Sequence, residues 1–195
     1  AAGLDALKHR YIHQSYPNGG GLDEIEREFG NIADAVVSPA HIEQILSHPF
    51  FRFACGSVRC HGGLASTEPR QQLLACLRAF GSNLRGREGM QEQLERCVFV
   101  DPRADFPIVS GDGYITRQVP LASGNTRIAL KASGSIPISM HGVENVPGAP
   151  EGMYRDGGLL DYHPVPSSFW QDDGLILYPH FYDHCKVGWF DKMLP

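Results

Sequence analysis

The spacing of apolar residues predicts alternating helices and strands along most of the chain. Four segments have the 3.6-residue periodicity of an amphipathic helix. They cover residues 4–16, 38–47, 69–80 and 124–132. A more acidic helix is expected around 22–29, and a charged helical stretch near 87–96 precedes a short strand. In the helix 69–80, Pro69 takes the first position, and the apolar side chains that follow are Leu73, Leu74, Cys76, Leu77 and Phe80.

Strands are expected where polar and apolar residues alternate or where a short apolar run is bounded by turn residues. The segments that meet this description are 51–58, 97–100, the pieces around 108 and 114–116, and 174–178, which has the strongest buried-strand pattern of the chain. Because these strands alternate with helices, we expect an α/β fold in layers, with a mainly parallel sheet. The last third is rich in proline and is expected to consist largely of loops.

Composition and charge narrow the classes of protein to consider. A chain of 195 residues can bury one core, so residues 1–195 are expected to form a single domain. The net charge of −5 gives no overall attraction for nucleic acid, and no nucleic-acid partner is expected. The five cysteines form no CxxC pair, which argues against a structural zinc site or a disulfide framework. Because the cysteines are odd in number and widely spread, a reducing, cytoplasmic setting is expected. No apolar run reaches the roughly 18 residues that span a bilayer.

The most informative stretch for chemistry combines two segments. The first is Ala-Ser-Gly-Ser-Ile-Pro over residues 132–137, and the second begins at Tyr154 and contains Asp156, Gly157 and Gly158. Two glycines after an aspartate allow positive φ and close backbone approach, and their N–H groups can orient the carboxylate. The alternative interpretation is an ordinary Asx turn between two strands.

Taken together, the two segments resemble the C-terminal half of the patatin-like phospholipase family. The resemblance extends over residues 120–180, and the first hundred residues share only compatible α/β patterning. It implies a three-layer α/β/α fold with a mainly parallel sheet and a Ser–Asp dyad that works without a catalytic histidine. It also implies that Asp156 is the catalytic aspartate, that Gly157 and Gly158 are its motif glycines, and that neither a metal nor an organic cofactor takes part.

The rest of the family's catalytic machinery is absent from the sequence. No serine lies in a Gly-x-Ser-x-Gly elbow, including Ser57, Ser66, Ser123 and Ser135. The glycine run 19–21 is not followed by the family's arginine, and Asp23 and Glu24 would repel an oxyanion. The chain begins at Ala1 without a methionine, so we expect the C-terminal part of a longer domain, incomplete at its N-terminus. A relative that naturally lacks the dyad is the alternative.

The resemblance implies a two-step acyl transfer in the intact parent. Asp156 would accept the proton of the serine, whose oxygen attacks an ester carbonyl, and water would then hydrolyse the acyl-enzyme. The expected partner is a lipid or a small ester as substrate, while a peripheral membrane contact and a homo-oligomer stay open. The alternative from a different class is a catalytically silent module that binds or scaffolds.

Several other groups of residues could carry chemistry but have simpler explanations. His180 and His184 have i, i+4 spacing, yet Pro179 and Gly188 shorten any helix there, so a metal site is not expected. His9 and His13 fit an exposed helix face. Cys55 and Cys60 fit buried positions, and the run 110–113 fits a hairpin turn. The aromatic residues of the last 27 positions fit core packing, with an apolar wall for an acyl chain or another subunit as the alternative.

Overall fold

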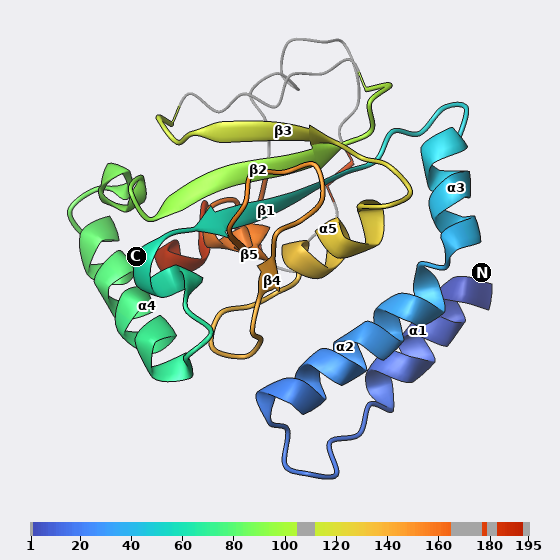
Figure 1. The fold of residues 1–195 in the computed structure, drawn as a ribbon, viewed down its shortest axis with the longest axis horizontal. Coiled ribbons are helices and arrows are strands. Elements are labelled where there is room, and N and C mark those ends of the chain that lie inside the picture. Colours follow the sequence, from blue (N-terminus) through green and yellow to red (C-terminus); the bar gives the residue numbers. More distant parts are fainter. Residues whose placement is uncertain (1, 105–111, 165–176, 179–182, 193–195) are drawn as a thin grey trace.

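The computed structural model describes residues 2–104, 112–164, 177–178 and 183–192 (Figure 1). The α-helices are α1 (Ala2–Ile12), α2 (Leu22–Val36), α3 (Pro39–Ser47), α4 (Pro69–Asn83) and α5 (Thr126–Ser133). The strands are β1 (Ala54–Cys60), β2 (Leu94–Val100), β3 (Thr116–Pro120), β4 (Val143–Glu144) and β5 (Met153–Asp156). Short 3₁₀ turns follow several of them: η1 (Gly62–Ala65), η2 (Arg87–Met90), η3 (Gly157–Leu159) and η5 (Trp189–Asp191). The strand expected at 174–178 lies mostly outside the described residues.

The five strands form one mixed sheet in the order β3-β2-β1-β5-β4. Only β2 and β3 are parallel, while β1–β2, β1–β5 and β4–β5 are antiparallel. The chain is therefore mixed α/β, as expected, but the prediction of a mainly parallel sheet is wrong for the described strands. The patatin-like three-layer architecture stays a proposal.

The path between β1 and β2 explains the antiparallel pairing. Cys60, the last residue of β1, pairs with Leu94, the first residue of β2. The N–H of His61 donates to the carbonyl oxygen of Gln93 at 2.9 Å. The connection through η1, α4 and η2 thus begins and ends at the same end of the sheet. β1 and β2 are therefore paired like the strands of a hairpin with a long insertion. A parallel pairing requires the connection to cross to the opposite end of the sheet.

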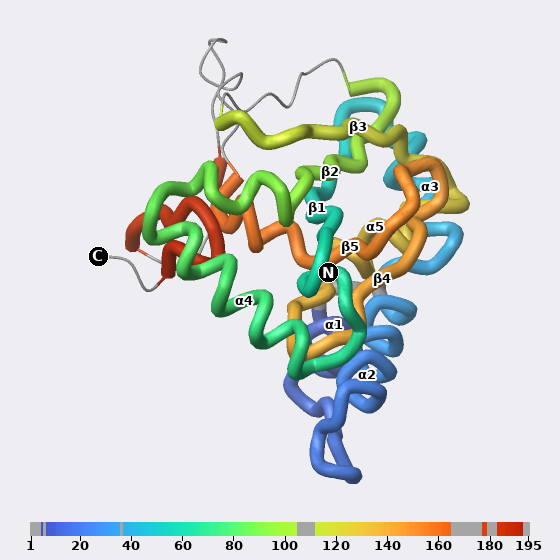
Figure 2. The backbone as a smooth tube through the Cα atoms, turned by 60° about the vertical axis from the view of Figure 1, so that its left-hand side comes forward, coloured from blue at the N-terminus to red at the C-terminus, as the bar shows by residue number. Residues whose placement is uncertain are grey.

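Helices pack against both faces of the sheet, and two separate hydrophobic cores result. Alternate residues of β1 and β2 point to opposite faces. Val58, Cys60 and Leu94 join the core beneath α4. Cys97 and Phe99 join the core beneath α5. Figure 2 shows α4 on one side of the sheet and α5 on the other.

Strand β2 begins three residues earlier than expected, and this replaces the end of the helix predicted over 87–96. Only the 3₁₀ turn η2 lies in that stretch, and Glu95 and Arg96 belong to the strand. Both charged side chains are buried. Glu95 pairs with Arg59 and Arg117, and Arg96 pairs with Asp112 and Asp161. Because each charge has an opposite partner, both can be buried within a strand. The same charges had led to the prediction of a helix.

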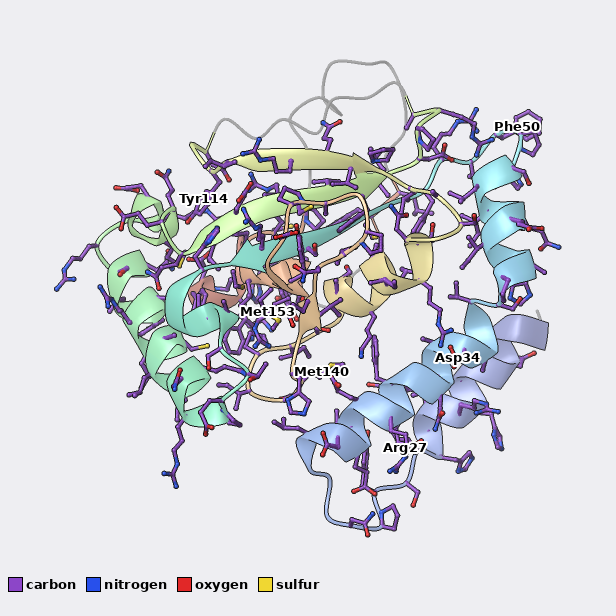
Figure 3. All side chains as sticks on the ribbon, in the orientation of Figure 1. Arg27, Asp34, Phe50, Tyr114, Met140 and Met153 are labelled. Carbon is purple, nitrogen blue, oxygen red and sulfur yellow. The ribbon has the colours of Figure 1, made fainter. Side chains whose placement is uncertain are left out.

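Helix α2 is attached to the rest of the molecule mainly through polar contacts. Arg127 of α5 forms an ion pair with Asp34 of α2, which Figure 3 labels. Lys131 reaches Glu26 at 3.8 Å, and the Nε2 atom of His141 lies 2.9 Å from Asp23. A Cβ atom on Gly134 would lie 2.8 Å from the ring of Phe29. The Phe29 ring therefore packs closely against Gly134 and leaves no room for a side chain at that position.

Arg155 on β5 is the largest fully buried side chain of the described residues. Its guanidinium donates to four backbone carbonyl oxygens at 2.7 to 3.1 Å, and none of these partners carries a charge. Two belong to the segment after β1 (Leu64, Ser66), and two belong to the loop before β4 (Met140, His141). One side chain therefore ties two loops to the strand that ends at Asp156.

We predict that Arg155→Met destabilises the fold by about 3 kcal/mol or more, because four buried carbonyl oxygens lose a charged donor at once. The measurement is the free energy of unfolding in urea. The control is Arg127→Gln, whose half-exposed side chain pairs with the half-exposed Asp34 and should cost less than about 1 kcal/mol. Equal losses in the two variants would show that Arg155 is not a structural tie.

Candidate functional site

Asp156 is the last residue of β5 and the N-cap of η3. Its Oδ1 atom accepts a hydrogen bond from the N–H of Gly158 at 2.7 Å, which is the contact of an Asx turn. The side chain is partly exposed, and Oδ2 has no hydrogen-bond partner among the described residues. The turn therefore fixes one carboxylate oxygen and leaves the other free to act on a proton.

The two glycines after Asp156 are required by close packing. A Cβ atom on Gly157 would lie 2.5 Å from the carbonyl oxygen of Gly56 in β1. One on Gly158 would lie 2.9 Å from Oδ1 of Asp156 and 3.0 Å from the ring of Tyr162. Neither glycine has a positive φ, so that part of the sequence argument is wrong. Close backbone approach, the other part, is what the structure shows.

Burial raises the pKa of Asp156 above its ordinary value, while the Gly158 N–H and the charge of Lys192 act in the opposite direction. A raised pKa means that the folded chain keeps a proton at a pH where the unfolded chain has lost it. The free energy of unfolding therefore falls as the pH rises through the pKa of the folded state. At neutral pH this carboxylate costs stability, and it is also a stronger base than an ordinary aspartate.

The structure brings together the two segments that carry the resemblance. The backbone N–H of Asp156 donates to the carbonyl oxygen of Ser135 at 2.9 Å. The hydroxyl of Ser135 donates to the carbonyl oxygen of Lys131 at 2.7 Å and is fully buried. Ser135 therefore supports the strand end that holds Asp156, and its own hydroxyl is occupied.

Ser57 was excluded as an elbow serine, yet the structure places it next to the candidate site. It is paired directly with Asp156 across the β1–β5 ladder, so the two side chains leave the same face of the sheet. Its hydroxyl is buried and finds no hydrogen-bond partner in the part of the chain that the structure describes. No sequence motif signals this pairing, because it depends on the register of two strands about a hundred residues apart. With 1% of its surface exposed, Ser57 is closed to a substrate in this conformation.

Asp161 has a structural role that separates it from Asp156. Its two carboxylate oxygens accept hydrogen bonds from the buried guanidinium of Arg96 at 2.5 and 2.8 Å. The same guanidinium donates to Asp112. Both oxygens of Asp161 are therefore engaged by a buried charge that Asp112 also helps to neutralise.

The glycine run near the N-terminus is not available to hold an oxyanion. Gly19 and Gly20 have positive φ. The N–H groups of Asn18 and Gly20 donate to the carboxylate of Glu24 at 3.2 and 2.9 Å. The chain's own side chain thus takes the position that a bound anion would occupy.

The histidines and cysteines form no metal site within the described residues. His180 lies outside the described residues, and His184 contacts the neighbouring Asp183. Cys60 is buried as expected, whereas Cys55 is only half-buried. Loss of solvation raises the pKa of both thiols to about 12, which is typical of unreactive cysteines. The rings of His9 in α1 and His13 just after it are tilted against each other with their centroids 4.4 Å apart, and both residues are exposed.

Comparisons with protein-family models, with curated proteins and with solved structures gave no match. Among the described residues, no helix has the length and apolar character needed to cross a bilayer. What can be said about function therefore comes from the residues and geometry described above.

We predict that Asp156→Asn leaves the free energy of unfolding at pH 7 unchanged or raises it, because the substitution removes a partly buried charge and keeps an oxygen for Gly158. The advantage of the variant should shrink as the pH is lowered through the pKa of Asp156. Urea unfolding at several pH values measures both. The control Asp161→Asn should cost about 1.5–3 kcal/mol, because it weakens charged hydrogen bonds to Arg96. The reverse order would show that Asp156 is the structural carboxylate.

A second prediction concerns the close approach of the turn to β1. Gly157→Ala should destabilise the chain by about 1–3 kcal/mol, since the added methyl group cannot be placed without moving backbone. Gly124→Ala is the matched control, because a Cβ atom there has nothing within 4 Å. Thermal unfolding of both variants makes the comparison. Equal midpoints would mean that the turn can move away from β1 at no cost.

Proposed function

We propose that this chain supplies the carboxylate base of a Ser–Asp acyl hydrolase and is the C-terminal part of a patatin-like domain. The observation that carries the proposal is the geometry of Asp156. One oxygen is fixed by Gly158, the other has no partner among the residues that the structure describes, and burial raises the pKa of the carboxyl. The contact between Ser135 and Asp156 adds support, because it joins the two segments of the resemblance.

In the proposed reaction, Asp156 moves a single proton. Oδ2 accepts the proton of a serine hydroxyl while the serine oxygen bonds to the carbonyl carbon of an ester. The tetrahedral intermediate expels the alcohol, which takes the proton back from Asp156. Water then attacks the acyl-serine with the same carboxylate as base, and the carboxylic acid and free serine are released. The nucleophile and the oxyanion donors come from residues beyond this chain, and the substrate is a lipid acyl ester or a small ester.

One observation favours a second candidate, a catalytically silent binding or scaffolding module. Ser57 and Ser135, the serines that adjoin Asp156 by register and by hydrogen bond, are both buried. A fold that keeps the Asp-Gly-Gly turn but has no solvent-accessible nucleophile would retain its apolar interior and would not hydrolyse esters. Activity of the longer polypeptide separates the two candidates.

We predict that Asp156→Asn, in a polypeptide that joins this chain to the preceding coding sequence of its gene, lowers kcat/KM for a short-chain nitrophenyl ester by about 10² to 10⁴. Asp161→Asn should change kcat/KM per folded molecule by much less, because both of its oxygens bind Arg96. If Asp161→Asn loses activity and Asp156→Asn does not, the base is Asp161 and the proposal names the wrong carboxylate. No turnover by the folded longer polypeptide would favour the silent module.

The chain by itself provides a further control. We expect no ester turnover from it, and Ser57→Ala tests the one serine that faces Asp156 across the ladder. Turnover that disappears in Ser57→Ala would show that the nucleophile lies within this chain, which would overturn the proposed division of the dyad.

A further inference from the structure

Helix α4 has its polarity reversed relative to an ordinary surface helix. The side that faces the sheet contains Gln72, Cys76, Ala79 and Asn83, all buried. The outer side carries Leu73, Leu74 and Leu77, which are 48%, 67% and 59% exposed, and Leu84 just after the helix is 59% exposed. Two of the four inward positions are amides, while the leucines that should drive folding are left in solvent. The leucines therefore serve something other than the core of this chain.

Arginines accompany the leucines along the same side. Arg70, Arg78 and Arg85 are exposed, and none of their side chains forms an ion pair or hydrogen bond within the described residues. Residues 69–85 contain no aspartate or glutamate, although the whole chain has a net charge of −5. Positive charge without a partner is thus concentrated beside an exposed apolar ridge.

The fold limits what can cover this face. The inner side of α4 is packed on the sheet, so a partner that wraps around a basic amphipathic helix has no access to it without unfolding. A two-fold contact between copies of α4 would place arginines from both chains together, with no acidic residue on the helix to pair with them. A flat anionic surface meets neither obstacle, because it engages a single helix face.

We propose that α4 binds the surface of an anionic phospholipid membrane. The leucines enter the boundary between headgroups and acyl chains, and the arginines contact the lipid phosphates while their aliphatic stems cover apolar surface. Each arginine contributes about fivefold to the binding constant near such a surface. Binding does not require Asp156, so this proposal stands or falls separately from acyl hydrolysis.

The experiment is vesicle co-sedimentation of the full chain with phosphatidylcholine vesicles, with and without phosphatidylserine. The expected result is binding that requires phosphatidylserine and weakens as salt is added. The double variant Arg70→Gln/Arg78→Gln should bind about 25-fold more weakly. Leu73→Gln/Leu77→Gln should lose about tenfold or more, because its apolar ridge is removed. Asp156→Asn should bind like the wild type.

Matched controls lie at the other end of the molecule. Phe50, beside α3, is 85% exposed, and Figure 3 labels it far from α4. Arg10 is exposed on α1. Phe50→Gln and Arg10→Gln should bind vesicles like the wild type, and these two variants and the α4 variants should keep the wild-type unfolding midpoint.

Three results would overturn the proposal. In the first, the α4 variants and the control variants bind vesicles equally well. Another is a concentration-dependent dimer in sedimentation velocity that the leucine variant abolishes, which would assign the face to a second copy. The third is binding to polyglutamate, but not to vesicles, that depends on α4, which would assign it to an acidic protein.

Discussion

The guanidinium of Arg155 is the contact on which the candidate site most depends. A buried cation is stable only if its donors are satisfied, and here four carbonyl oxygens from two loops perform that function. Because successive residues of a strand face opposite sides, Arg155 points toward the α4 side and Asp156 toward the α5 side. The side chain that fixes the strand end therefore stays out of the space around the carboxylate, and the site gains rigidity without losing access.

Asp156 and Asp161 show how neighbouring carboxylates in one loop acquire different roles. Asp161 neutralises the buried charge of Arg96, so its negative charge contributes to stability. Asp156 has one backbone donor and an unused oxygen, so its charge opposes stability at neutral pH. This asymmetry is the physical basis for the proposal that Asp156, and not Asp161, carries the chemistry.

Local pattern predicted where the described α-helices and the turn at Asp156 lie, although α2 runs beyond the expected 22–29. The helix expected over 87–96 is instead the 3₁₀ turn η2 followed by β2. The expected helix 38–47 is α3 with Ser38 as its cap, and the helix 69–80 is α4 extended by one turn. The direction of the strands could not be read in this way, since it depends on where the long connection from β1 returns. Glu95 and Arg96 suggested a charged helix because their partners, Arg117 and Asp161, are distant in sequence. The pairing of Ser57 with Asp156 was hidden for the same reason.

The reversed polarity of α4 connects the proposed membrane face with the candidate site. Gln72, on the inner side of α4, accepts a hydrogen bond through Oε1 from the N–H of Ile138 at 2.7 Å. Ile138 has a φ of 70°, a conformation that is costly for a β-branched residue and that needs support from its surroundings. It lies in the segment 135–140. The carbonyl oxygen of Ser135 accepts a hydrogen bond from the N–H of Asp156, and that of Met140 accepts one from Arg155. An amide in the core side of α4 is thus explained by the loop that it holds. Gln72 and Arg155 therefore both hold the segment 135–140 from the α4 side of the sheet.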